Sequence, residues 1–205
     1  TLQKKYDLNC AIASQWHYSQ VTSLAERLVR DMKKKNTLQT VHFNFSQPFA
    51  AEQLVHYSSR TALLPHILQI IYSTGLSDFE EAEIELKKAS HEYLACSITD
   101  DGSIIEIVSD LSASAERIRV MSAGNLRADF LASFKDGKAI RYPSVTHNGK
   151  TTKIEEDNLQ VMIDSIVSAF LRHADISKDK HLLTFERYAP IALFQVRLEK
   201  ELQHK

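Results

Sequence analysis

Hydrophobic and polar positions alternate through the middle of the chain, the pattern of strands that bury one face. The clearest example is 93–108, where two β-branched apolar runs flank Asp101 and Gly102. A tight hairpin turn needs positive φ, which glycine adopts without a steric penalty. This segment therefore predicts an antiparallel hairpin.

Similar alternation predicts several more short strands around the hairpin. The turn dipeptides Asp136-Gly137 and Asn148-Gly149 separate the later ones. The Glu-rich segment 79–89 also fits an exposed helix, although its alternation favours a strand. Strands are predicted at 40–45, 79–89, 116–121, 130–134, 138–145, 151–154, 181–188 and 191–198.

Helical periodicity marks three other regions. In 9–35, apolar residues recur at three- and four-residue steps, and Asn36 follows as a cap. The segment 49–73 is also helical, but Pro65 predicts a kink or a break. Thr152 and Glu155 have capping-box spacing, which predicts a helix from there to about residue 173.

Together these elements predict an α+β fold in one domain spanning 1–205. We expect an antiparallel β-meander sheet packed against an N-terminal helix, a kinked helical pair and one later amphipathic helix. No internal repeat or linker-like stretch divides the chain.

Composition narrows the classes of function. The 205 residues carry a net charge of −1, so no global field attracts the chain to nucleic acid. Glycine occurs only five times, and neither GxGxxG nor GxxxxGK[ST] is present. The sequence therefore predicts no dinucleotide or nucleotide cofactor.

Cysteine usage and hydropathy bear on the compartment. With only Cys10 and Cys96, a disulfide framework is absent, and we expect a cytoplasmic protein, although one bridge between the two stays open. No apolar run approaches the roughly 20 residues needed to span a bilayer, so no membrane partner is expected.

Glu85 and Lys87 could form a Mg²⁺-dependent nuclease site. Strands of some nucleases carry Glu-x-Lys, where the carboxylate binds the metal and the lysine polarises water or phosphate. Two residues apart on a strand, both side chains share one face. The motif is short, and a solvated strand face explains it better.

The nine histidines show no HxH, HExxH or HxxxH spacing, so no metal site is predicted. Of the two thiols, Cys96 fits a buried apolar position better than a reactive one.

A turn-rich basic segment, 135–153, is the best candidate for a nucleic-acid surface. Basic side chains interleaved with rings on a β-ribbon could bind phosphates and stack a base. Arg117, Arg119 and Arg127 precede the segment and could extend it. Protection of an exposed sheet edge by lysines explains the same pattern. The candidate residues are Lys135, Lys138, Arg141, Tyr142, Lys150 and Lys153.

With no catalytic or cofactor motif, the sequence favours a non-catalytic intracellular adaptor or regulatory domain that binds another protein. A nucleic-acid-binding domain using 135–153 is the alternative, and a nuclease centred on Glu85 and Lys87 is less favoured. The pattern predicts no particular oligomeric state.

Overall fold

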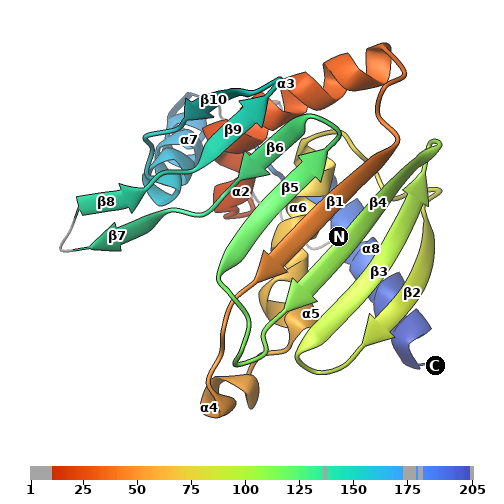
Figure 1. Ribbon diagram of the computed structural model, residues 1–205. Helices are drawn as coiled ribbons and strands as arrows, with labels where there is room; N and C mark the ends of the chain where they lie inside the picture. Colours follow the sequence, from red (N-terminus) through yellow and green to blue (C-terminus); the bar gives the residue numbers. More distant parts are fainter. Residues whose placement is uncertain (1–10, 136–137, 173–178, 180–181, 204–205) are drawn as a thin grey trace.

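An eight-stranded sheet is the frame of the protein (Figure 1). The computed structural model describes residues 11–135, 138–172, 179 and 182–203. The strand order is β10-β9-β6-β5-β1-β4-β3-β2, and β7 pairs with β8 in a separate ribbon. The strands are β1 (Thr40–Ser46), β2 (Glu83–Ala89), β3 (Tyr93–Asp100), β4 (Ser103–Asp110), β5 (Ile118–Ala123), β6 (Leu126–Asp129), β7 (Ser133–Lys135), β8 (Lys138–Arg141), β9 (Ser144–His147) and β10 (Lys150–Lys153).

The sheet is mixed, so the predicted antiparallel meander is wrong. β1 lies in the middle, parallel to β4 and antiparallel to β5. Turn signals reveal pairing between strands that follow one another, but β1 and β4 are joined by a long crossover. No local pattern marks that parallel pair, which explains the error.

The predicted hairpins at the two tight turns are confirmed. Asp101 and Gly102 connect β3 to β4 with φ of 47° and 72°, and Asn148 and Gly149 connect β9 to β10 with φ of 51° and 76°. Positive φ at both central residues matches the twist of the flanking strands. The Asp136-Gly137 turn lies outside the described residues.

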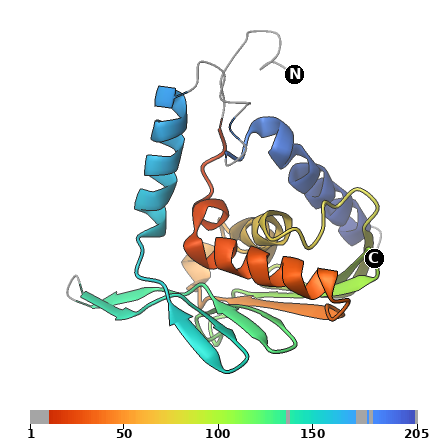
Figure 2. The ribbon, with the colours of Figure 1, turned by 90° about the horizontal axis from the view of Figure 1, so that it is seen from above.

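Helices cover one face of the sheet, as Figure 2 shows. α6 lies over the sheet centre, with α3 and α8 on either side of it. The helices are α2 (Gln15–Tyr18), α3 (Gln20–Lys34), α4 (Ala51–Leu54), α5 (Ser59–Ala62), α6 (Leu64–Ser73), α7 (Asn158–Arg172) and α8 (Phe185–Gln203). No helix among the described residues is long and apolar enough to cross a membrane.

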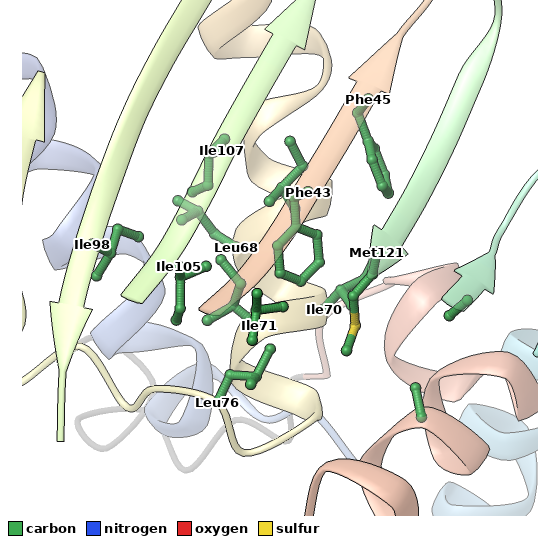
Figure 3. Close-up of a cluster of buried hydrophobic side chains, with 14 of the residues drawn as sticks. Phe43, Phe45, Leu68, Ile70, Ile71, Leu76, Ile98, Ile105, Ile107 and Met121 are labelled. Atoms are coloured by element: carbon green, nitrogen blue, oxygen red, sulfur yellow. The ribbon is translucent and has the colours of Figure 1, made fainter. Parts of the chain in front are cut away.

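The core lies between α6 and the central strands (Figure 3). Phe43 of β1 and Ile105 of β4 come from the sheet, and Leu68 and Ile71 come from α6; each is at most 1% exposed. One continuous apolar cluster includes side chains of α3, α6, α8 and the strands from β1 to β6 and β9. The single-domain prediction for 1–205 is compatible with this cluster and stays a prediction.

The predicted helix over 9–35 is divided in two. Ser19 has an extended backbone, ends α2 and caps α3 through its side chain. The first two residues of the predicted helix, Asn9 and Cys10, lie outside the described residues. Asn36 adopts a φ of 53° just after α3, which confirms it as part of the C-terminal cap.

The predicted capping box at Thr152 and Glu155 is wrong. Thr152 is paired in β10, and α7 begins only at Asn158. The Asp157 carboxylate accepts hydrogen bonds from the amides of Leu159 (2.9 Å) and Gln160 (3.2 Å). Because Thr152 pairs with Val145 in the sheet, it does not cap a helix. Asp157 caps α7 in its place.

The later amphipathic helix, α7, is confirmed as a helix but not as a cover for the sheet. It stands beside the other helices and packs mainly on α2. Ala169 is its buried residue, whereas the apolar stripe is partly exposed. Leu159, Ile163, Val167 and Phe170 expose 53%, 44%, 49% and 44% of their surface.

The closing strands predicted over 181–188 and 191–198 are wrong, because 185–203 forms α8. Ile191, Phe194 and Leu198 are at most 1% exposed, and their spacing defines one helical face. Pro190 suggested a break, yet α8 continues through it. In the second turn a proline removes one amide donor and crowds the carbonyl four residues earlier, and the buried face of α8 offsets that cost. His181 lies outside the described residues.

The helical pair predicted over 49–73 is instead three short helices, α4 to α6. Pro65 occupies the first turn of α6, where a missing amide proton costs little. The strand predicted at 130–134 is wrong for most of its length, because β6 ends at Asp129 and β7 begins only at Ser133.

Adjacent isoleucines on β4 test which face of the sheet carries the core. We expect Ile105→Ala to lower the free energy of unfolding by about 2–5 kcal/mol, since it empties a filled site. Ile104 is 43% exposed on the uncovered face, so Ile104→Ala should cost less than about 1 kcal/mol. Urea denaturation measures both, and equal losses would contradict this packing.

Candidate functional site

A cleft of about 280 Å³ lies beyond the carboxyl end of β1, lined by residues of α2, β5, the segment after β6 and the start of α7. We call it the Trp16 cleft. Its lining combines the aromatic rings of Trp16 and Phe130 with charged side chains, which are Arg117, Arg119, Glu156 and Asp157. It is small, near the lower end of the size range of small-molecule sites.

Trp16 is the only tryptophan of the chain and is 3% exposed. Its ring meets Phe130 edge-on at 5.7 Å between centroids, and His66 of α6 at 6.2 Å. The guanidinium carbon of Arg119 lies 5.4 Å from the centroid of the indole. These contacts fix the indole between a cation and two rings.

Arg119 reaches the cleft because of its register on β5. It pairs with Phe45 of β1, and residues directly opposite each other share one face of a sheet. The side chain therefore points toward the helices. The sequence suggested that Arg119 could extend the surface of 135–153, and it does not. Burial lowers the pKa of Arg119, and the charge of Arg117 adds to this effect. An arginine still keeps its charge at neutral pH.

Three polar atoms of the cleft have no hydrogen-bond partner within the part of the chain that the structure describes. They are Nε1 of Trp16, Nε of Arg119 and Oδ1 of Asn158, and all three are buried. The other end of Arg119 is held, since Nη2 donates to Oε1 of Gln47 at 2.9 Å. Each buried donor or acceptor without a partner costs about 1–3 kcal/mol. Three in one small cleft form an incomplete set that a ligand could complete.

His66 lies behind Trp16. Burial lowers its pKa to about 4, and the positive charge of Arg119 contributes. Its Nδ1 is buried without a hydrogen-bond partner. The imidazole is therefore neutral at physiological pH and leaves Arg119 as the cation beneath the cleft.

Two carboxylates on the rim are already engaged. Glu156 accepts from Ser19 Oγ at 2.9 Å and from the amide of Gln20 at 2.8 Å, which caps α3. Asp157 caps α7. Since both acids serve helix ends, a ligand would meet the two donors, the amide of Asn158, the guanidinium of Arg117 and the aromatic surface.

The sequence did not single out this cleft, because its residues lie far apart in the chain. Trp16 comes from a four-residue helix, Arg119 from β5, and Asn158 from the start of α7. One signal was available: a lone tryptophan together with an arginine inside an apolar alternating run.

The proposed nuclease residues lie elsewhere, on the uncovered face. Glu85 accepts a hydrogen bond from Ser97 at 3.1 Å, and Lys87 forms an ion pair with Glu106 at 2.7 Å. Ser97 pairs directly with Glu106, so Glu85 and Lys87 share a face as expected. His42 Nδ1 also contacts Glu106, at 2.9 Å. These contacts describe a polar strand surface.

Within the ranges that the structure describes, no three His, Cys, Asp or Glu side chains converge to hold a metal ion. Cys96 is a free thiol and 2% exposed, as its apolar strand predicted. Burial raises its pKa to about 12.

Five of the six candidate nucleic-acid residues are distributed over two sheets, and Tyr142 lies between β8 and β9. Lys135, Lys138 and Arg141 belong to the β7–β8 ribbon. Of these three, Arg141 is the one whose side chain the structure describes. Arg141 forms an ion pair with Asp129, and Tyr142 is 36% exposed.

Lys150 and Lys153 are exposed on β10, three residues apart, which places them on opposite faces of the main sheet. The described side chains thus do not form one basic face. Nucleic-acid binding by this segment stays a prediction.

Similar folds occur in solved structures of oxidoreductases and of a regulator. An aldose-aldose oxidoreductase from Caulobacter crescentus, complexed with glycerol, is similar with a TM-score of 0.64 and 13% identity; the match covers 98% of this chain and 62% of that one. The UDP-N-acetylglucosamine 3-dehydrogenase GnnA from Acidithiobacillus ferrooxidans gives a TM-score of 0.60 at 16% identity, covering 96% and 63%.

The transcriptional regulator Gal80p from Kluyveromyces lactis gives a TM-score of 0.62 at 10% identity, covering 100% of this chain and 63% of Gal80p. The sequence matches no model of a known protein family and no curated protein. At these identities the likenesses show the fold alone. They place this fold in both catalytic and regulatory proteins, and this chain spans under two thirds of each.

His66 makes stability depend on pH. The folded protein resists protonation of His66 until about pH 4, whereas the unfolded chain takes up the proton near 6.5. Stability is therefore complete above pH 6.5 and is lost as pH falls toward 4. Between pH 7 and pH 5 we expect a loss of about 2 kcal/mol that is absent in His66→Gln. Denaturant titrations at both pH values measure it, and parallel losses in the two proteins would refute the assignment.

Proposed function

We propose that this chain is a small-molecule-binding domain and that the Trp16 cleft binds a sugar-like, polyhydroxylated ligand. The observation that carries the proposal is the set of three unpaired polar atoms, on Trp16, Arg119 and Asn158, around one cleft. Hydroxyl groups can both donate and accept, so one polyol can satisfy two N–H donors and an amide oxygen together.

The aromatic floor supports the same class of ligand. The rings of Trp16 and Phe130 offer apolar surface on which C–H groups can pack, while the few polar atoms fix orientation. The charge of Arg119 favours a ligand with a carboxylate or with electron-rich oxygens. The solved structures of similar fold include an aldose-aldose oxidoreductase with glycerol and a sugar-nucleotide dehydrogenase, which supports this choice.

Within an oxidoreductase architecture, we assign this chain recognition of the substrate and not of a dinucleotide. Its sequence lacks the Gly-rich turn that brings a backbone close to a pyrophosphate. His66 is neutral at pH 7 and lies next to Trp16, so its role here is to hold the indole by packing.

Trp16 supplies a direct test, since its fluorescence is the only indole emission of the chain. We expect glycerol, glucose or gluconate to shift that emission saturably. Arg119→Met should abolish the shift while leaving the stability equal or higher, because it removes a buried charge and fills the same volume.

Arg127→Gln is the matched control, since Arg127 pairs with Ser122 and lies exposed on β6. It should bind like wild type. If none of the three compounds shifts the emission, or if Arg119→Met responds like wild type, the proposal fails.

A second candidate function, regulation through a protein partner, rests on α7. The exposed apolar stripe of this helix is a face of the kind that docks into a partner's groove. The likeness to the regulator Gal80p shows that the fold also serves proteins described as regulators. An adaptor role would place the contact on α7 and not on the sheet.

Substitutions on the stripe separate this candidate from the first. Ile163→Gln with Val167→Gln should leave folding and Trp16 emission unchanged, because both side chains are over 40% exposed. We expect affinity capture from the native cell to retain a partner with the wild type and lose it at least tenfold with the double variant. Identical sets of captured proteins would contradict an adaptor role for α7.

A further inference from the structure

A second concave site lies on the helical side, separate from the Trp16 cleft. It is a groove of about 700 Å³ between α3, the end of α6 and the start of α8. We call it the basic groove. Its lining includes Arg27 and Arg30 of α3 and Arg187 of α8.

Positive charge dominates the groove. Three guanidinium groups line it, against the single lining carboxylate of Glu26. Glu26 pairs with Arg30 four residues on, which leaves the groove with an excess of cations. Among residues that the structure describes, no hydrogen bond or ion pair joins Arg27 to a protein group. Arg187 is held in place, since its Nη1 donates to the carbonyls of Asp179 and Leu182, both at 2.7 Å.

Thr22 gives an independent indication of a ligand. It lines the groove and is 2% exposed, yet its buried Oγ1 has no hydrogen-bond partner among the residues that the structure describes. A helical threonine usually bonds to the carbonyl four residues earlier. For Thr22 that residue is Tyr18, which belongs to α2 and precedes the break at Ser19. The hydroxyl therefore remains available inside a basic groove.

The start of α3 is not itself the site. The amide of Gln20 is taken by Glu156, and that of Val21 by the Ser19 hydroxyl. The groove must therefore attract an anion through its side chains. Thr22, Arg27 and Arg30 come from α3, and Arg187 comes from α8.

We propose that the basic groove binds the phosphate group of a small phosphorylated molecule. Planar guanidinium groups match the oxygens of a phosphate, which accept several charge-assisted hydrogen bonds at once. The Thr22 hydroxyl donates to one further oxygen. The volume of the groove admits a small molecule, whereas a nucleic-acid backbone needs an extended track of cations.

Calorimetric titration of the full chain with inorganic phosphate and with pyrophosphate, at constant ionic strength, tests the site. We expect one saturable site per chain. Arg27→Gln should weaken the affinity about tenfold, through loss of a charged hydrogen bond. Lys200→Gln, which removes an exposed cation of α8 outside the groove, should bind like wild type.

Thr22→Val is expected to change phosphate affinity and stability in opposite directions. It should weaken phosphate binding about three- to tenfold, while the melting temperature of the free protein stays equal or rises, because an unpaired hydroxyl leaves the interior. Absence of saturable heat, equal weakening by Lys200→Gln, or a lower melting temperature for Thr22→Val would each overturn the proposal. Trp16 emission should respond to sugars equally in Arg27→Gln, so this result is independent of the first cleft.

Discussion

Packing of α6 on the apolar face of β1, β4 and β5 determines where the rest of the protein lies. Phe43 and Ile105 meet Leu68 and Ile71 there in a fully buried layer. A one-residue slip of any central strand would turn its apolar side chains to the uncovered face. The register of β5 is therefore fixed by the core, and with it the position of Arg119 opposite Phe45.

That constraint explains why the Trp16 cleft costs stability. A sheet face built for apolar side chains carries a guanidinium at its end, which has one hydrogen-bond partner, Gln47. Placing the indole of Trp16 over it leaves further polar atoms unpaired. Proteins commonly keep such unfavourable arrangements where a ligand later supplies the missing contacts. The basic groove shows the same combination at Thr22, with excess charge and an unused hydroxyl.

Local patterns predicted much of the secondary structure and little of the site. The turn at Asp101 and Gly102 was predictable because its chemistry is contained in two residues. The parallel pairing of β1 with β4 was not, since nothing local links them. α8 was mistaken for strands because Pro190 resembled a break. Alternation in β5 was read correctly, but it could not show that the arginine side faces the helices.

One resonance tests the central claim that the Trp16 cleft holds hydrogen-bond donors kept for a ligand. The chain has a single tryptophan, so its ¹⁵N-labelled form gives one indole N–H signal. We expect a signal typical of an unbonded indole in the free protein, which moves downfield and exchanges more slowly with water when a sugar or sugar acid is added. A signal that is already hydrogen-bonded, and that no such compound moves, would contradict it.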